Sequence, residues 1–491
     1  MNKFHLWAIL ILLSLLIFSC ESVDPFDIDE IDFGDPEIGV PLVNSTFFIA
    51  DLGVNPDNNT EVISDDEGRV TLRYSDEIPP IAIGEVFPAE KNKTIAVSTN
   101  PQSFQLPFHN VDIREGTLKN SSMTIELTNP TSEVLTVIID IPEIRDVLGA
   151  RFSVSEVLTG NQKSSVLIDL SDWTVVSPQG ALELRYTAST SSNANVEISD
   201  MQLYFERLEF AYLEGVFDNA NLPSTEDLID ISFFNSWVSG GLELSDPRLI
   251  FDIKNSIGIA SELKLNFANI TNVDGEFFQL EYDQLNQGIA FGHPSLSQVG
   301  ESVSTAVEIN GSNSNAVDLF QKKPTRIDYD LELAVIPNQE PGFYTDESEI
   351  AIDAVVELPL FMKANDLILQ DTIGFEEIAF EDIEGAGELK ISLTNAFPIG
   401  VGVNLFFLNA ADETMFTLVD ADDWVSVAAN TQQQLTVEDL EPQISSIPIS
   451  EEDVAKIPSV TKVLTRVHIT TTEGFQDDFV WVFDHLSLIH I

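Results

Sequence analysis

Apart from carboxylates, this 491-residue chain has few side chains that could perform covalent or acid–base chemistry. Cys20 is the single cysteine, and there are six histidines. Cys20 directly follows the apolar run MNKFHLWAILILLSLLIFS, which carries Lys3 near its start. This run has the charge order of an export signal and is short for a membrane-spanning helix, which needs about 20 apolar residues. We therefore expect the thiol to stand at the end of a leader segment.

The stretch IFSC that ends at Cys20 resembles a bacterial lipobox. Ile17 matches the aliphatic position and Ser19 the small position, whereas Phe18 departs from the usual small residue between them. The resemblance implies that residues 1–19 are a lipoprotein signal peptide and that Cys20 is lipidated. The alternatives are an ordinary cleaved signal and an uncleaved anchor. The anchor is disfavoured because acidic residues follow Cys20 where a basic cluster would be expected.

The remaining sequence contains no recognisable catalytic motif. The histidines beyond the leader are His109, His293, His468, His485 and His490. None of them belongs to an HExxH pair, and the chain has neither a GxSxG elbow nor a P-loop. A glycosidase needs two carboxylates set across a sugar, and the sequence does not single out a pair among its 81 acidic residues. Oxygen-rich loops at 27–32, 55–61 and 420–423 lack the complete EF-hand pattern, so we predict no metal site and no cofactor.

Two tryptophans are the candidate ligand-binding residues. Trp173 lies in SDWTVV and Trp424 in DDWVSV, at similar distances after two related segments. Exposed aromatic rings are the platforms that glycan binding requires. The alternative is that both rings belong to the core, because aromatic side chains bury large areas.

The charge balance excludes one class of partner. The formal net charge is −58, from 81 acidic and 23 basic residues. Nucleic-acid binding needs a basic surface, so we predict no nucleic-acid partner.

A hydrophobic content of 44% with 32 phenylalanines is too high for a disordered acidic chain. The length exceeds the size at which single cores stop growing, so we expect several domains.

Alternating apolar and polar residues predict β-strands along most of the chain. The clearest runs cover 68–76, 123–130, 133–142, 201–215, 326–337 and 349–360. Pro142 is expected to end its strand, and the best helix signal begins at Ser450 as N-cap and is limited by Pro458. These patterns predict an all-β protein of tandem antiparallel β-sandwiches with few short helices. Residues 20–36 are acidic and predict a tether.

A similar pattern occurs three times. Each occurrence has a Gly-x-Leu start, an alternating strand, an asparagine turn and a second alternating strand, and the turn residues are Asn129, Asn255 and Asn395. Asparagine suits such turns because its side chain bonds to its own backbone. The spacing predicts three sandwich domains, at 37–215, 216–345 and 346–491.

The segment LTNAFPIGVGVNLFFL at 393–408 resembles the LEA14-type water-stress β-sandwich. The whole chain, with PEIGVPLVNSTFFIADL at 36–52 and the segment 355–375, resembles large lipoproteins of Bacteroidota that have no established activity. The acidic stretch 21–36 resembles the export tags of that group's surface lipoproteins. These resemblances imply that the protein is anchored to the outer membrane by its lipid, facing either the cell surface or the periplasm.

We therefore expect a non-enzymatic binding or scaffold module of the cell envelope. It would be attached to the membrane by its N-terminal lipid and would have an envelope protein or a glycan as partner. One alternative is an accessory lipoprotein that captures glycans. Another is a hydrolase with a carboxylate acid/base pair.

Overall fold

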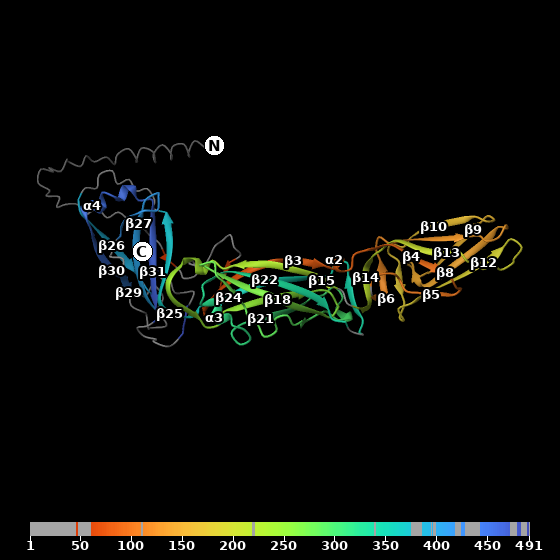
Figure 1. Cartoon of the computed structure of the whole chain (residues 1–491), viewed down its shortest axis with the longest axis horizontal. Helices are drawn as coiled ribbons and strands as arrows, with labels where there is room; N and C mark the ends of the chain where they lie inside the picture. The colour runs from red at the N-terminus through yellow and green to blue at the C-terminus, as the bar shows by residue number, and fades with distance from the viewer. Residues whose placement is uncertain are drawn as a thin grey trace, which may run out of the picture. The chain divides into compact units, whose positions relative to one another are not determined.

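Antiparallel strands form nearly all of the described structure, which confirms the prediction of an all-β sandwich protein (Figure 1). The computed structural model describes residues 46–47, 60–109, 111–218, 221–337, 340–374, 385–393, 395, 399–417, 424–427, 442–471, 479–482 and 489–490. The predicted leader, Cys20 and the tether 20–36 lie outside these residues. So do the loops 27–32 and 420–423 and most of 55–61.

The strands group into three sandwiches. The first sandwich contains β4 Glu90–Val97, β5 Gln102–Phe104, β6 Val111–Leu118, β7 Ser122–Thr128, β8 Leu135–Arg145, β9 Arg151–Leu158, β10 Lys163–Asp169, β11 Thr174–Val176, β12 Leu182–Thr190, β13 Met201–Leu208 and β14 Phe210–Phe217, extended by β23 Gly342–Thr345. The middle sandwich contains β2 Thr60–Ser64, β3 Val70–Ala82, β15 Asn221–Asp230, β17 Arg248–Asn255, β18 Ser261–Asn272, β19 Phe277–Gln279, β20 Ile289–Phe291, β21 Val303–Ile309, β22 Pro324–Val335 and β24 Glu349–Pro359.

The third sandwich contains β1 Thr46–Phe47, β16 Trp237–Leu244, β25 Phe361–Gly374, β26 Gly387–Leu393, β27 Gly400–Leu408, β28 Thr414–Thr417, β29 Val425–Val427, β30 Gln443–Ile449, β31 Lys462–Thr470, β32 Val480–Trp481 and β33 Ile489–His490. The described helices are short: α2 Ile83–Val86, α3 Ala316–Phe320 and α4 Glu451–Val454, with 3-10 turns η2 Phe233–Ser236, η3 Leu296–Gln298 and η5 Ile457–Ser459. No described helix is long and apolar enough to cross a membrane.

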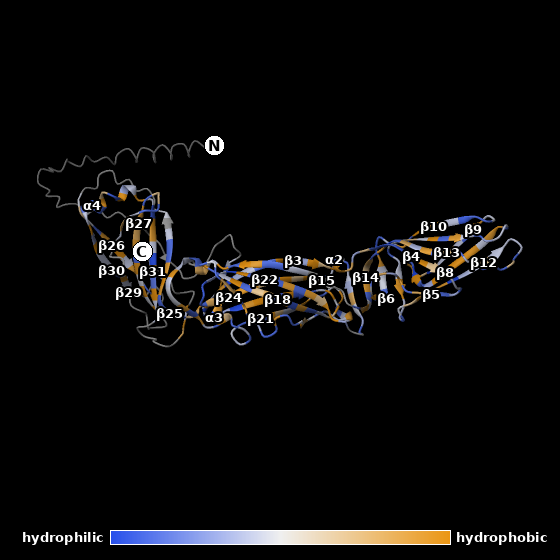
Figure 2. Ribbon diagram, in the orientation of Figure 1, coloured by the Kyte–Doolittle hydropathy of each residue, from blue (hydrophilic) through white to orange (hydrophobic). Residues whose placement is uncertain are grey.

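Alternation along each strand builds the cores. In β12, the side chains of Leu182, Leu184, Tyr186 and Ala188 are buried while their neighbours face outward. Figure 2 shows the same change between hydrophobic and hydrophilic residues along many strands. Each fully buried Val, Leu, Ile or Phe side chain contributes about 1.5–3 kcal/mol, so the sandwiches need no disulfide.

One strand order recurs: it is complete in both sheets of the first and middle sandwiches and in one sheet of the third. One sheet runs β10-β7-β13-β4 in the first and β21-β17-β24-β3 in the middle sandwich. In the third, β30 pairs with β26, β33 contacts β26, and β1 pairs with β33. The opposite sheets run β9-β8-β12-β5, then β19-β18-β22-β15, then β28-β27-β31-β25.

The sandwiches are nested in the sequence. Apart from β23, the first sandwich is inserted between β3 and β15 of the middle one. Both lie between β1 and β25 of the third, whose strand β16 falls between β15 and β17. Figure 1 shows this as red-orange β3 among the green strands β15, β18 and β22. Our predicted domains 37–215, 216–345 and 346–491 are consecutive, whereas β3 pairs with β24 and so joins the first and last of these ranges in one sheet.

The three turn asparagines occupy equivalent corners, where the chain passes from one sheet to the opposite one. Asn129 lies between β7 and β8, Asn255 is the last residue of β17 before the chain continues to β18, and Asn395 lies between β26 and β27. All three are buried, being 1%, 0% and 5% exposed. The amide of Asn255 accepts from Ile257 N at 2.8 Å and donates to Gly292 O at 3.1 Å. A buried amide that satisfies the backbone of its own turn explains the choice of asparagine.

Other local predictions had mixed outcomes. Ser450 caps α4, as predicted, because its side chain accepts from Asp453 N. Pro142 does not end its strand, since β8 continues to Arg145. The proline falls where β8 stops pairing with β12 at Asp140 and starts pairing with β11 at Ile144, so no ladder needs its missing N–H. The run 201–215 forms two strands, β13 and β14, in different sheets.

A carboxylate at the edge of the middle sandwich makes stability depend on pH. Burial and the nearby charge of Asp227 raise the pKa of Asp76, which accepts a hydrogen bond from the Tyr329 hydroxyl at 3.1 Å. The native state therefore binds the carboxyl proton of Asp76 more tightly than the unfolded chain does. The stability that protonated Asp76 contributes is present below the unfolded pKa of about 4 and is lost as pH rises through the folded pKa. We expect Asp76→Asn to raise the free energy of unfolding at pH 7 and to change it little at pH 4.

Urea unfolding at both pH values tests this expectation. Asp66→Asn, at an exposed turn residue, removes the same charge and serves as the control. Equal effects of the two substitutions at pH 7 would show that only the net charge matters.

Candidate functional site

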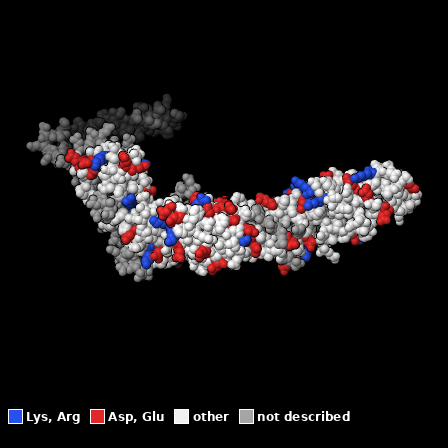
Figure 3. Space-filling model, in the orientation of Figure 1, with Lys and Arg blue, Asp and Glu red and all other residues white. Residues whose placement is uncertain are grey.

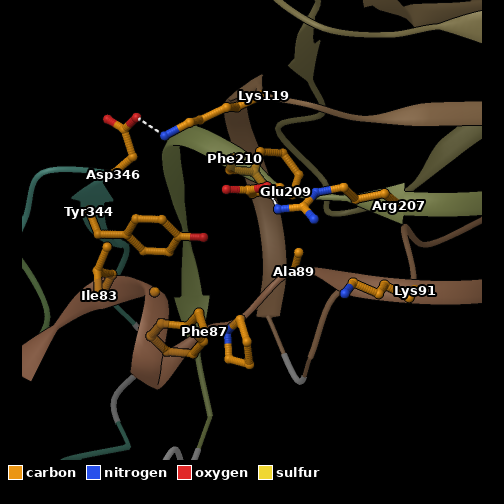
Figure 4. Close-up of a pocket in the computed structure, with 12 residues that line it drawn as sticks. Ile83, Phe87, Ala89, Lys91, Lys119, Arg207, Glu209, Phe210, Tyr344 and Asp346 are labelled. Carbon is orange, nitrogen blue, oxygen red and sulfur yellow. Dashed lines mark hydrogen bonds and ion pairs between the residues drawn. The ribbon is translucent and has the colours of Figure 1, made fainter.

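A cavity of about 290 Å³ lies where strands of the first sandwich meet α2 and β23 (Figure 4). Its lining comes from four separate stretches of the chain: 83–91, Lys119, 207–210 and 344–346. We call it the Tyr344 pocket. Ligand sites commonly occur at such meetings of structural units.

A β-bulge in β13 sets the direction of Arg207. The pairing of β13 with β7 shifts between Phe205 and Arg207, so one residue on β13 is left over. The buried positions therefore change from Met201, Leu203 and Phe205 to Leu208. Without this shift the alternation would direct Arg207 into the core. Bulges often redirect a side chain in this way next to functional sites.

Three cations line the pocket. Arg207 lies directly across from Lys91 in the pairing of β13 with β4. Figure 4 shows both side chains pointing into the cavity from that sheet, with Lys119 at the opposite rim. Lys91 is exposed and has no ion-pair or hydrogen-bond partner among the described residues. Its ammonium group is therefore available to a ligand.

Both carboxylates of the lining are already paired. Lys119 Nζ lies 2.6 Å from Asp346 Oδ2, and this hydrogen bond raises the pKa of Lys119. Arg207 donates from two nitrogens to one carboxylate oxygen of Glu209. The Glu209 backbone is fixed in turn, since its carbonyl accepts from Lys119 N and from Ser121 Oγ, each at 2.9 Å. The lining thus carries three positive and two negative groups.

The Tyr344 side chain is only 2% exposed, yet its hydroxyl has no hydrogen-bond partner among the described residues. Figure 4 shows this hydroxyl directed into the cavity, toward the side from which Arg207 and Glu209 project. Burial, together with the charge of Glu209, raises the pKa of Tyr344, so the hydroxyl stays neutral and can donate. The ring is buried but the hydroxyl opens onto the cavity, where it can donate to a ligand atom.

Aromatic rings hold the tyrosine in place. The Tyr344 ring stacks on Phe87 with centroids 5.6 Å apart and an interplanar angle of 7°. Phe217 contacts both rings, and Phe108 packs edge-on against Phe210 at 4.9 Å. Such pairs contribute about 0.5–1.5 kcal/mol beyond their buried area. The hydroxyl is therefore presented by a rigid group.

The charge of the pocket contrasts with that of the chain. Figure 3 shows Lys and Arg side chains gathered near the start of β4, on a face where acidic side chains are otherwise widespread. Three of the chain's 23 basic residues line this one cavity. An anion would be repelled by most of the surface and attracted here.

A second depression differs from the Tyr344 pocket in the charge of its lining and in the bonding of its tyrosine. It surrounds Tyr282 and is lined by Glu281, Asp283 and Asp318 without any cation. The Tyr282 hydroxyl donates to Gln284 Oε1 at 2.8 Å, so this tyrosine is satisfied within the protein. The depression therefore lacks the open donor that marks the Tyr344 pocket.

The predicted ligand-binding tryptophans are not brought together. Trp173 belongs to the first sandwich, half-buried, with its ring edge-on to Phe152 at 5.8 Å. Trp424 belongs to the third sandwich, half-buried and stacked on His468 at 5.1 Å. Trp173 follows β10 whereas Trp424 precedes β30, so the two differ in topological position. Their role in binding stays a prediction.

Sequence reasoning missed the Tyr344 pocket because its lining residues are far apart in the chain. One local signal was present: Lys91 and Lys93 form a Lys-x-Lys pair in a strongly acidic sequence. Among the described residues, no three His, Cys, Asp or Glu side chains are placed to hold a metal ion.

No protein-family model matches the chain, and no curated protein matches it. Similar solved structures include that of a putative secreted protein from Parabacteroides distasonis, with 11% identity, a TM-score of 0.25, and coverage of 92% of this chain and 97% of that one. Another is the CBM22-1–CBM22-2 tandem domain of Paenibacillus barcinonensis Xyn10C, with 10% identity, a TM-score of 0.15, and coverage of 65% and 97%. A third is the N-terminal domain of the Streptococcus gordonii adhesin Sgo0707, with 10% identity, a TM-score of 0.14, and coverage of 88% and 90%. Scores this low carry no argument about function.

Proposed function

We propose that this protein is a non-enzymatic binding module of the bacterial cell envelope, held by a lipid on Cys20, and that the Tyr344 pocket is its ligand site. The observation that carries the proposal is the Tyr344 hydroxyl, which opens onto the cavity from a buried ring. It lies beside Lys91, which has no partner among the described residues. These groups can bind a ligand without any rearrangement of the protein. Preorganised donors of this kind lower the cost of association.

The chemistry of the lining supports binding rather than hydrolysis. A carboxylate acid/base pair needs one protonated acid and one free base. Glu209 and Asp346 are both bound to cations of the protein, Arg207 and Lys119 respectively. Neither carboxylate is therefore free in the way that an acid/base pair requires.

Retention of envelope polysaccharide by the purified mature chain, residues 20–491, tests the binding proposal. We expect polysaccharide to be retained by the protein and its reducing ends to remain constant in number. Tyr344→Trp, which fills the cavity, should abolish retention, while Lys163→Gln, on β10 and outside the pocket, serves as control. Retention that Tyr344→Trp leaves unchanged would contradict the pocket assignment, and new reducing ends would indicate an enzyme.

The anchor is tested separately in the bacterial cell. We expect Cys20→Ala to move the protein from the membrane fraction to the soluble fraction, because multiple acyl chains hold a protein stably and their loss removes that anchor. Cys20→Ala should leave polysaccharide retention by the purified protein unchanged. A Cys20→Ala protein that still sediments with membranes would contradict lipid anchoring.

A further inference from the structure

We propose that the Tyr344 pocket binds a small hydroxy acid of the size of one acidic sugar residue, with its carboxylate placed between Lys91 and Arg207. This inference rests on the proposed binding function and adds the chemical class of the ligand. It follows from three properties of the lining: its charge, its mixture of donors and acceptors, and its volume.

The ligand's charge follows from the available donors. Lys91 has no partner among the described residues. The bonds from Arg207 to Glu209 use Nε and one terminal nitrogen, so the other terminal nitrogen can still donate to a ligand. A carboxylate between these groups would accept charge-assisted hydrogen bonds, which are roughly twice as strong as neutral ones.

The ligand's hydroxyl groups follow from the remaining polar atoms. The Tyr344 hydroxyl can donate to a ligand oxygen, while the outer oxygens of Glu209 and Asp346 can accept from ligand hydroxyls. Ile83, Phe87 and Phe210 supply an apolar wall that would cover the C–H face of a ring. A purely inorganic anion would use only the cations and the Tyr344 hydroxyl and would leave the acceptors and the wall unused.

The ligand's size follows from the cavity. A volume of about 290 Å³ stands at the lower end of small-molecule pockets, which are typically about 300–1,000 Å³. One ring with a carboxylate fits this range, whether it is free or the terminal residue of a polysaccharide. Both sources share the chemistry that the pocket recognises.

Calorimetry with the mature chain, residues 20–491, tests the ligand class at constant ionic strength. The probes are D-glucuronate and D-galacturonate, the neutral sugars D-glucose and D-galactose, inorganic sulfate, and a short oligogalacturonate. We expect at least one of the acids to bind, the neutral sugars to bind at least tenfold more weakly, and sulfate to bind no better than the neutral sugars. Tighter binding of the oligomer would identify a chain end as the source, and equal binding would identify the free acid.

Two variants connect the binding to this pocket. Tyr344→Phe keeps the ring stack on Phe87 and removes only the hydroxyl, so we expect about tenfold weaker binding with no loss of stability. Lys91→Gln should also weaken binding about tenfold, whereas Lys163→Gln, on β10 and paired with Glu126, should not.

Some outcomes would overturn the hydroxy-acid assignment alone. Equal binding of the neutral sugars, or sulfate binding as tight as glucuronate, would exclude that class while polysaccharide retention through the pocket could still hold. Acid binding that Tyr344→Phe and Lys91→Gln leave unchanged would place the site elsewhere. Failure of both the acids and the polysaccharide to bind would contradict the proposed function as well.

Discussion

A chain beginning at residue 84 will fail to fold its middle sandwich, whereas a chain beginning at residue 59 will fold it. The two chains differ by residues 59–83, which contain β2, β3 and Ile83, the first residue of α2. β3 pairs with β24 in the middle of a sheet, so its loss exposes the hydrogen-bonding edge of β24. The first sandwich should survive in both, because its strands are contiguous in sequence apart from β23.

The size of the effect follows from the side chains that β3 contributes. Val70, Leu72, Tyr74, Ile78 and Ile81 are each no more than 5% exposed. At about 2 kcal/mol for each buried side chain, their removal costs about 10 kcal/mol. Domains are stable by only about 5–15 kcal/mol, so the middle sandwich cannot tolerate this loss.

Hydrogen exchange of the two chains separates the sandwiches. In the shorter chain we expect amides of β17 and β24 to exchange at the rate of an unfolded chain, while amides of β7 and β13 stay protected. Full protection of β17 and β24 in the shorter chain would show that the nested pairing of β3 is unnecessary for the middle sandwich.

The second large effect is expected at the corner of the first sandwich. Asn129→Asp should destabilise that sandwich by more than about 3 kcal/mol. The Asn129 amide donates to Glu133 O at 2.8 Å and to Thr159 O at 3.0 Å, and its oxygen accepts from Thr131 N at 2.9 Å. Aspartate keeps the acceptor, loses both donated bonds and places a charge in a site that is 1% exposed.

Asn161→Asp provides a matched control. Asn161 is exposed, has a φ of 56° that aspartate also tolerates, and gains the same charge. In urea unfolding we expect its effect to be a few tenths of a kcal/mol. The cost of Asn129→Asp should diminish as pH falls to about 4, where an aspartate of the unfolded chain takes up its proton. Equal effects of the two substitutions would contradict a bonding role for the Asn129 side chain.

Features set by neighbouring residues could be predicted from the sequence. Alternation in GRVTLRYSD anticipated β3, and the Ser450 N-cap anticipated α4. The asparagines at 129, 255 and 395 were expected to form turns because their side chains act on the adjacent backbone. Such interactions span only a few residues, so a short window of sequence contains the whole cause.

Features that depend on distant pairing could not be predicted. Nothing local to β3 indicates that its partner is β24, more than 250 residues away, so consecutive domains were the natural expectation. Pro142 was expected to end its strand because a change of ladder partner cannot be seen in sequence. The Tyr344 pocket could not be predicted either, because it is formed by Lys91, Arg207 and Tyr344 from three separate regions of the sequence.

The most direct test of the account observes Tyr344 itself. The chain has seven tyrosines, so selective ring labelling gives few NMR signals, and the signal that Tyr344→Phe removes belongs to Tyr344. We predict that adding D-glucuronate or D-galacturonate shifts this signal in a saturable way, and that Lys91→Gln weakens the response. A Tyr344 signal that stays in place while either acid binds to the protein would contradict the central claim that this pocket is the ligand site.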